Sequence, residues 1–440
     1  MKSLSATLRG IILPRNTFVA DKKASLRYFW IMFFVYVYIY MTKQTFSAAM
    51  AAIVAEGVLT KSQTGTIVAV FYLLYAPLQI FGGVLADRYN PETLIVVGLL
   101  GSGAINVVLF LNQNYYVMLI MWGLNAIFQF PLYPALFKII SSGIAAEVRP
   151  KAMFYFNLAS YFGLILSFFV GAIVTVWQYN FFIASAILFG STLLFFIGAK
   201  RKEKYAVPIE NAQKEKSSND GQENLKTGRS TFKLFLISGF MLFIPAVLLR
   251  GVLENGIKSV SPTMLSESYA NISPSIGNLM NILIIISGTI GMTIVRSFAL
   301  NRWKDNEAVG VLILYGLSIP FVAFLIMIGT IPIWLALVSL CMISALLSPA
   351  HMLLTFASMK FAKFGKSGTA AGLINAAASV SIMLLNYVFL KLADGWGWEA
   401  VNIAFTVMMI ISLVFVFCAI KKWKRFTHFR IFGHKKHLKI

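Results

Sequence analysis

Long apolar stretches alternate with short polar ones along almost the whole chain. A stretch of about 20 apolar residues is long enough to cross a bilayer as an α-helix. Because unpaired backbone groups are not tolerated in lipid, short connections between such stretches predict a bundle of membrane helices. We predict membrane helices at residues 28–56, 63–86, 93–112, 115–140, 152–175, 180–199, 234–260, 275–297, 308–328, 333–358, 368–390 and 399–420. The predicted fold is therefore an all-α membrane protein with twelve transmembrane helices.

One long polar stretch interrupts this pattern, at residues 200–232, and it is rich in Lys, Glu, Asn and Ser. Such a composition is typical of a flexible linker. It separates a six-helix half at 1–199 from a second at 233–420, and a basic tail follows at 421–440. An equal division at a polar linker favours two related halves, as in transporters that are built from internal repeats.

Weak internal similarity supports two pseudo-symmetric halves. Asn157 and Ser160 in the fifth predicted helix resemble Asn375 and Ser379 in the eleventh.

Composition excludes a soluble protein. Apolar residues make up 58% of the chain and charged residues only 12%, about half of the usual charged fraction. The same apolarity argues against nucleic-acid binding, although the net charge is +22. With both termini in the cytoplasm, 32 of the 38 Lys and Arg residues fall on the cytoplasmic side, as the positive-inside rule requires. We therefore expect a multi-pass protein of the plasma membrane with cytoplasmic termini.

The sequence contains no recognisable set of residues that would bind a cofactor or catalyse a reaction. Cys341 and Cys418 both lie in apolar runs, where cysteine is usually a small packing residue. The sequence offers no His/Cys/Asp cluster for a metal and no catalytic Ser-His-Asp set. We expect no enzyme activity and no cofactor. The expected partners are a small-molecule substrate and the lipid bilayer, and the protein is expected to be a monomer.

A charged motif follows the second predicted helix and contains Gly83, Asp87, Arg88, Asn90 and Pro91. It resembles the Gly-x-x-x-Asp-Arg signature of the major facilitator superfamily. Its Asp-Arg-x-Asn-Pro ending is more specific, and is similar to the organophosphate:phosphate antiporter family, which includes glycerol-3-phosphate and hexose-phosphate carriers. The resemblance implies two six-helix halves with the substrate site between them.

Two interpretations of this motif remain open. Gly83 allows neighbouring helices to approach closely, and the resemblance implies that Asp87 and Arg88 form a latch at the inner gate. The alternative is an ordinary charged turn that obeys the positive-inside rule.

A stripe of polar side chains marks the first predicted helix. Tyr36, Tyr40, Lys43 and Ser47 recur at three- and four-residue spacings, so they share one helix face. An ionisable residue deep in a membrane helix indicates a functional site, whereas a lysine that reaches the interface would be structural. The resemblance implies that Lys43 replaces a phosphate-binding arginine and that Tyr36, Tyr40 and Tyr75 match tyrosines beside it.

The seventh predicted helix departs from the antiporter pattern. The family has a second arginine where this chain has Glu254, with Arg250 one turn earlier and Lys258 one turn later. Glu254 could pair within its own helix, pair with Lys43, or act as a proton-coupling carboxylate. The last two would make the site less cationic than in the family and favour a zwitterion or a weaker anion over a phosphate ester.

Further polar residues could line the same site. These are Gln129 in the fourth predicted helix, Asn157 and Ser160 in the fifth, and Asn375 in the eleventh. Hydrogen bonds between helices are the alternative explanation for each.

Together these features predict a secondary transporter of a small polar solute, expected to be anionic, that works by alternating access. A proton or a counter-substrate would be coupled to it. The alternative function is a transporter-like membrane sensor that binds a solute and signals to a partner.

Overall fold

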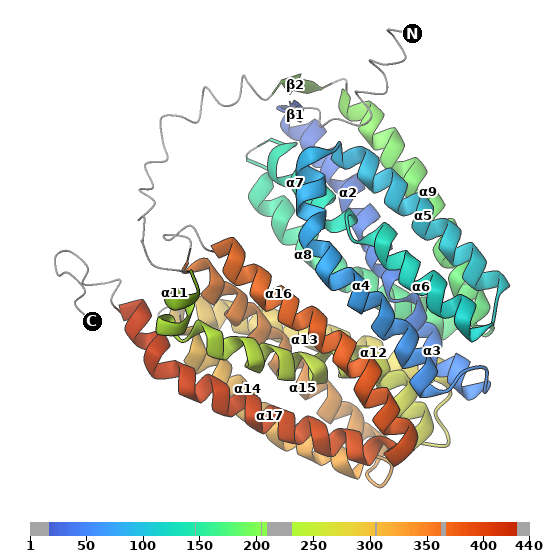
Figure 1. Ribbon diagram of the computed structural model, residues 1–440, viewed down its shortest axis with the longest axis vertical. Helices are drawn as coiled ribbons and strands as arrows, with labels where there is room; N and C mark the ends of the chain where they lie inside the picture. The colour runs from blue at the N-terminus through green and yellow to red at the C-terminus, as the bar shows by residue number, and fades with distance from the viewer. Residues whose placement is uncertain are drawn as a thin grey trace. The chain divides into compact units, whose positions relative to one another are not determined.

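The computed structural model describes residues 17–145, 147–203, 205–208, 231–303, 306–361 and 367–428. These residues are overwhelmingly helical (Figure 1). The chain divides into two compact units, Met1–Gly221 with Ile272–Ile282, and Gln222–Asn271 with Leu283–Ile440.

The first unit contains the helices of the N-terminal half. They are α2 (Lys22–Lys43), α3 (Thr45–Ala55), α4 (Lys61–Arg88), α5 (Pro91–Leu111), α6 (Tyr115–Gln129), α7 (Leu132–Ser142), α8 (Arg149–Ile173) and α9 (Gln178–Glu203).

The second unit contains the helices of the C-terminal half. They are α11 (Thr231–Ser238), the 3₁₀ turn η1 (Phe240–Leu242), α12 (Phe243–Ser268), α13 (Pro274–Arg302), α14 (Glu307–Phe324), the 3₁₀ turn η2 (Leu325–Met327), α15 (Ile333–Met359), α16 (Ser367–Leu384), the π-helical η4 (Leu385–Phe389) and α17 (Leu390–His428). The start of α13 is the exception, because Ile272–Ile282 groups with the first unit.

These helices follow the twelve predicted segments, and nine helical spans among the described residues are long and apolar enough to cross a membrane. Some of these spans join two helices, as Tyr115–Ile140 joins α6 and α7. Several segments are broken where one continuous helix was predicted. The first is interrupted at Gln44, between α2 and α3, and the fourth breaks at Pro131, between α6 and α7. Proline lacks a backbone N–H and cannot continue the hydrogen-bond ladder.

Polar residues at the loop ends explain where many helices begin. The side chains of Asp21, Thr60, Asn90 and Asn114 each accept a hydrogen bond from a backbone N–H in the first turn of α2, α4, α5 and α6. Such N-caps satisfy donors that have no partner inside the helix.

A two-stranded antiparallel sheet was not predicted. It pairs β1 (Thr17–Val19) with β2 (Ala206–Pro208) (Figure 1). Residues 206–208 belong to the segment that the sequence indicates as a flexible linker, and here they form a short strand. Residues 209–230 of that segment lie outside the described residues.

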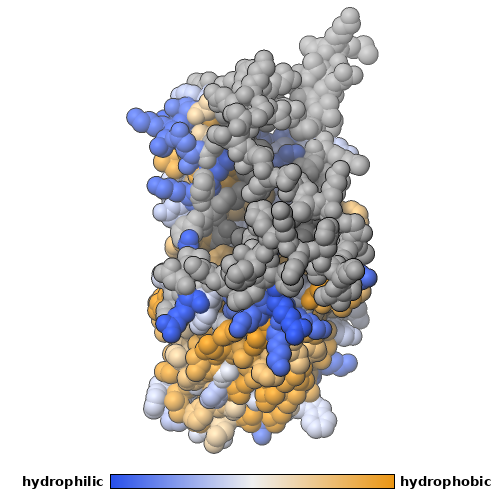
Figure 2. All heavy atoms as spheres, turned by 90° about the vertical axis from the view of Figure 1, so that its left-hand side faces the viewer, coloured by the Kyte–Doolittle hydropathy of each residue, from blue (hydrophilic) through white to orange (hydrophobic). Residues whose placement is uncertain are grey.

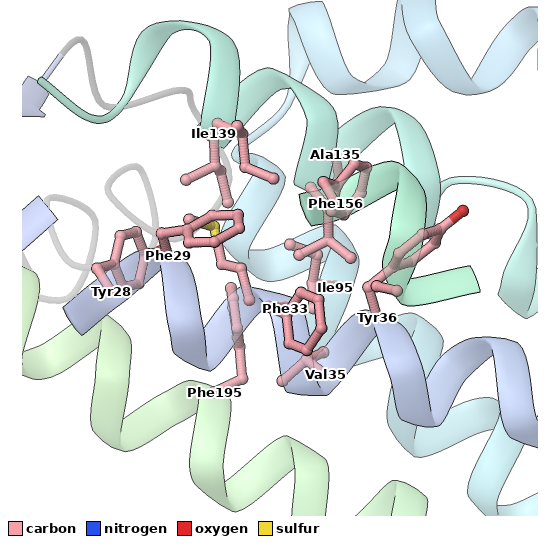
Figure 3. Packing of buried hydrophobic residues seen from close by; sticks show 14 of the residues in the cluster. Tyr28, Phe29, Phe33, Val35, Tyr36, Ile95, Ala135, Ile139, Phe156 and Phe195 are labelled. Carbon is pink, nitrogen blue, oxygen red and sulfur yellow. The ribbon is translucent and has the colours of Figure 1, made fainter. Parts of the chain in front are cut away.

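Aromatic and aliphatic side chains form the core of the first unit. Phe29, Phe33, Ile139 and Phe195 pack together between α2, α7 and α9 (Figure 3). Outward-facing hydrophobic side chains are also abundant, and Figure 2 shows them gathered below a border of hydrophilic ones. Hydrophobic surface of this extent is typical of a protein that contacts lipid.

Glycines bring helices close together in both units. A Cβ atom on Gly163 of α8 would lie 2.4 Å from the backbone oxygen of Val37 in α2. In the second unit, a Cβ atom on Gly291 of α13 would lie 2.1 Å from the backbone oxygen of Ala345 in α15. Close backbone approach of this kind is a common basis of helix packing in membranes.

A repeated hydrogen bond joins the first and last helices of each half. The indole nitrogen of Trp177, beside α9, donates to Glu56 at the end of α3 (3.1 Å). The indole nitrogen of Trp398 in α17 donates to Glu267 near the end of α12 (2.7 Å). The two bonds occupy corresponding places in the two halves and agree with the predicted pseudo-symmetry.

Candidate functional site

Lys43 is the last residue of α2 and lies where the first membrane segment breaks. The backbone N–H of Gln44 still bonds to the carbonyls of Met41 and Thr42, but Gln44 has left helical geometry (φ −100°, ψ 0°). Gln44, the residue at the break, is itself polar and follows Lys43 directly.

Aromatic rings surround the ammonium group of Lys43. Its Nζ lies 3.7 Å from the ring centroid of Tyr75, 5.3 Å from that of Tyr72 and 5.7 Å from that of Tyr40. The ring of Phe71 completes the set at 5.9 Å. We call Tyr40, Phe71, Tyr72 and Tyr75 the aromatic cage. Ring faces carry partial negative charge and attract a cation, most strongly when the cation is removed from water.

The aromatic cage does not neutralise Lys43. No ion pair among the described residues involves this lysine. A ring quadrupole stabilises a cation without adding a counter-charge. Lys43 therefore has no acidic partner among the described residues, and an anionic ligand could pair with it.

Amide side chains extend the cage. Gln79 donates from Nε2 to the hydroxyl of Tyr75 (3.4 Å), and Gln44 donates from Nε2 to the hydroxyl of Tyr72 (3.5 Å). Sequence reasoning identified Tyr75 but missed Tyr72. The missed signal is the spacing of three residues that puts both tyrosines on one face of α4.

Tyr36 belongs more to the core than to the cage. Its ring stacks on Phe156 of α8 with centroids 4.2 Å apart, and the side chain is buried (Figure 3). It contacts the cage through Tyr40, whose ring centroid lies 6.0 Å away. The predicted stripe on the first helix thus connects the core to Lys43.

A second charged group lies within the other unit, along α12. Glu254 forms ion pairs with Arg250 and with Lys258, one turn to either side. Its Oε1 accepts hydrogen bonds from Lys258 Nζ (2.6 Å) and from Ser348 Oγ of α15 (2.9 Å). Arg250 Nη1 donates to Oε2. The pairing within the helix, one of the three alternatives for Glu254, is the one observed.

Residues of α15 and α14 complete this group, and sequence reasoning missed Ser348 and Tyr315. Arg250 donates from Nη1 to the carbonyl of Leu347 (3.1 Å) and from Nη2 to Nδ1 of His351 (3.2 Å). Because arginine has no acceptor, Nδ1 of His351 accepts that bond and carries no proton. Tyr315 of α14 is fully buried and lies close enough to Arg250 and Glu254 to interact with their charges.

Gln129 forms a hydrogen-bonded network between α5 and α6. Its Nε2 donates to Ser102 Oγ (3.1 Å), and Ser102 donates to Oδ1 of Asn125 (2.6 Å). All three side chains are buried. This is the helix–helix alternative that the sequence left open, and contact of Gln129 with a solute remains a prediction.

The other predicted polar residues are less fully described. Ser160 is half-buried in α8, and the side chains of Asn157 and Asn375 lie outside the described residues, although both positions are helical. Their proposed contact with a solute remains a prediction.

The structure corrects part of the prediction for the gate. Gly83, Asp87 and Arg88 were assigned to the loop after the second helix, but α4 continues through Arg88 and is followed by Asn90, which caps α5. Their side chains lie outside the described residues. Near them, Lys138 of α7 donates from Nζ to the carbonyl of Ala86 (2.7 Å). A lysine there satisfies a carbonyl that the end of α4 leaves unpaired.

Comparison with known protein families shows to which family the chain belongs. Residues 32–386 match the model of the Major Facilitator Superfamily. The chain belongs to that superfamily. It is an integral, multi-pass membrane protein, and its relatives are solute transporters rather than enzymes.

Two named relatives agree with the predicted resemblance to the organophosphate:phosphate antiporter family. The chain is 23% identical over 410 residues to a probable hexose phosphate transport protein of Chlamydia pneumoniae, covering 88% of this chain and 90% of the relative. It is 22% identical to the glycerol-3-phosphate transporter of Bacillus subtilis, covering 93% and 95%. The resemblance to the organophosphate:phosphate antiporters is confirmed.

Solved structures show the same fold at low identity. A crystal structure of the peptide transporter POT matches with a TM-score of 0.70 and 15% identity, covering 94% of this chain and 97% of that one. The nucleoside transporter NupG matches with a TM-score of 0.68 and 13% identity, covering 91% and 100%. The all-α fold with twelve membrane helices is confirmed.

Proposed function

We propose that this protein is a secondary transporter that moves a small polar organic anion across the plasma membrane by alternating access. The observation that carries the proposal is the contrast between its two charged groups. Lys43 lies in an aromatic cage without a counter-ion among the described residues, whereas Arg250 and Lys258 share the carboxylate of Glu254.

The charge balance favours an anion of low charge. In a membrane helix, an ionisable residue is retained at a cost of several kcal/mol and is usually functional. Lys43 offers one point charge and cannot form the paired hydrogen bonds that arginine offers to a phosphate. Arg250 and Lys258 are already bonded to Glu254. A monoanion such as a sugar acid, or a zwitterion, suits this arrangement better than a doubly charged phosphate ester.

The relatives support an organic anion as the substrate, and one of them supports a sugar acid. The transporters of hexose phosphate and glycerol-3-phosphate carry polar organic anions. A probable L-galactonate transporter of Escherichia coli is 26% identical over 137 residues, which is 31% of this chain and 30% of the relative. Galactonate is a sugar acid, the class of solute that one uncompensated lysine favours.

A sensor is the second candidate function. The membrane sensor protein UhpC of Escherichia coli is 33% identical over 94 residues, but this is 21% of each chain. The named transporters of hexose phosphate and glycerol-3-phosphate match over most of their length. Transport is therefore the better supported function.

Counterflow in reconstituted vesicles separates these functions. Vesicles preloaded with a sugar acid, an amino acid, a sugar phosphate or inorganic phosphate would be supplied with the same solute in labelled form outside. We expect accumulation of the labelled sugar acid and little of the phosphates. Tight binding without counterflow would favour the sensor, and phosphate-driven counterflow of sugar phosphates would contradict the proposed substrate class.

The same vesicles test coupling. A proton or a counter-substrate would drive the transport, since a secondary transporter uses a gradient. If a proton is coupled, an imposed pH gradient will drive accumulation of the solute without any preloaded counter-substrate. If a counter-substrate is coupled, uptake will require preloading at every pH.

We also propose that Asp87 and Arg88 act at the inner gate and that both termini face the cytoplasm. The bond from Lys138 to the carbonyl of Ala86 supports this placement, because it ties α7 to the end of α4 beside the motif. Asp87→Asn should slow transport and change labelling of cysteines placed at the inner gate. Unchanged transport and unchanged labelling would contradict the latch.

A further inference from the structure

The carboxylate of Glu254 is held as a bound anion would be held. Its two oxygens accept hydrogen bonds from a guanidinium, an ammonium and a hydroxyl, those of Arg250, Lys258 and Ser348. Donors of this kind are the usual ligands of carboxylate, phosphate and sulfate groups. The whole group lies within the second unit, on α12 and α15.

More donors are present than this carboxylate uses. Nε of Arg250 and the hydroxyl of Tyr315 are buried and have no hydrogen-bond partner among the described residues. Buried polar groups are usually bonded, so each unpaired donor needs an explanation. A site with unused donors around a carboxylate is suited to an anion with more oxygens.

We propose that Glu254 permanently occupies an oxyanion site formed by Arg250, Lys258 and Ser348, and that this occupation excludes phosphate-type anions from the site. The inference deepens the proposed function, because it assigns the rejection of doubly charged substrates to one residue. The side chain of Glu254 is tethered four residues from each cation, so no free anion at ordinary concentration can displace it.

His351 positions the key donor of this site. Its Nδ1 accepts from Nη2 of Arg250, while the carbonyl of Leu347 accepts from Nη1. These two bonds hold the guanidinium toward α15 independently of Glu254. The guanidinium would therefore remain in place when the carboxylate is removed.

The test is the binding of inorganic phosphate to the purified full-length protein in detergent. Glu254→Ala removes the built-in anion and opens space, and Glu254→Gln removes the charge while keeping the size. We expect at least tenfold tighter phosphate binding by Glu254→Ala than by the wild type, and a smaller gain for Glu254→Gln. Phosphate should also raise the midpoint of thermal unfolding of Glu254→Ala, because a ligand that binds only the folded state stabilises it.

Three further variants make the result specific. Glu399→Ala removes an exposed carboxylate from the same unit and should not change phosphate binding, so a gain there would indicate a general charge effect and overturn the proposal. Adding Arg250→Gln to Glu254→Ala should abolish the gain. Adding Lys43→Met should preserve it, since Lys43 belongs to the first unit.

Equal phosphate affinity of the wild type and both folded Glu254 variants would overturn the inference, as would a gain that survives Arg250→Gln. These outcomes are distinct from a failure of the proposed function. That function fails if no organic anion shows counterflow in the wild type, whatever the Glu254 variants bind.

Discussion

Lys43 and Glu254 occupy equivalent positions in the two halves of the chain and carry opposite charges. Each lies thirteen residues before a glutamate, Glu56 and Glu267 respectively, that accepts a hydrogen bond from a tryptophan indole. The two tryptophan bonds fix the register between the halves without reference to any relative. The two corresponding helices thus hold a cation in one half and an acid in the other, and only the acid has an ion-pair partner among the described residues.

Lys43→Met should abolish transport without unfolding the protein. Methionine keeps most of the side-chain volume inside the aromatic cage but removes the charge that an anion needs. We expect at least a 100-fold loss of counterflow, and partial activity for Lys43→Arg, which keeps the charge in a different shape. Lys391→Met, at an exposed lysine, is the matched control. Normal counterflow by Lys43→Met would remove Lys43 from the substrate site.

Tyr75 should act through its ring more than through its hydroxyl. Its centroid lies 3.7 Å from Lys43 Nζ, the shortest distance in the cage. Because a buried cation–π contact contributes about 2 kcal/mol, Tyr75→Leu should weaken solute binding by roughly tenfold or more. Tyr75→Phe keeps the ring and loses only the hydrogen bond from Gln79.

The affinities of the two Tyr75 variants, measured by equilibrium binding of the transported solute, check this prediction. A hydroxyl that contacts the solute directly would reverse the order, with Tyr75→Phe as defective as Tyr75→Leu.

The site was predictable from sequence where it depends on one helix. The spacing of Tyr36, Tyr40 and Lys43 predicts a shared face, and the structure confirms that Tyr40 lies beside Lys43. The spacing of Arg250, Glu254 and Lys258 allows the ion pairs that are observed. Ser348 was missed because it comes from another helix, and single-helix periodicity says nothing about which neighbour faces a charge. Tyr72 was missed although its three-residue spacing from Tyr75 puts the two tyrosines on one face of α4.

The fold followed from hydrophobic length, since a stretch of about 20 apolar residues crosses a bilayer as a helix and pairs its own backbone groups there. The helix breaks at Gln44 and Pro131 were not predicted, because hydropathy averages over a window longer than a break. The strand at 206–208 was missed for a related reason. Its polar surroundings are typical of a linker, and its partner at 17–19 lies far away in sequence.

The buried ion pair of α12 should show strong coupling in stability. Arg250→Met leaves Glu254 without one of its two cations, and breaking a buried pair from one side costs about 3–5 kcal/mol. Glu254→Leu alone leaves Arg250 bonded only to His351 and the carbonyl of Leu347. The double variant removes both charges but also takes the carboxylate away from Lys258, so it should be more stable than Glu254→Leu, in which Arg250 and Lys258 both lose that carboxylate.

A double-mutant cycle on thermal unfolding in detergent measures this coupling. If the losses of stability in the two single variants simply add up to that of the double variant, Lys258 and Ser348 are sufficient hydrogen-bond partners for Glu254 without Arg250. A double variant as stable as the wild type would show that the pair serves function rather than folding.

Glycine at position 291 should be essential for packing α13 against α15. A Cβ atom there would lie 2.1 Å from the carbonyl oxygen of Ala345, and backbone cannot move aside as a side chain can. Gly291→Ala should therefore separate the helices and strongly lower the midpoint of thermal unfolding.

Gly190 in α9 is the matched control, because a Cβ atom there meets nothing within 4 Å. Gly190→Ala should be neutral or stabilising by up to about 1 kcal/mol, since alanine favours helix more than glycine does. Equal effects of the two substitutions would show that helix propensity, rather than close backbone approach, determines the outcome at both sites.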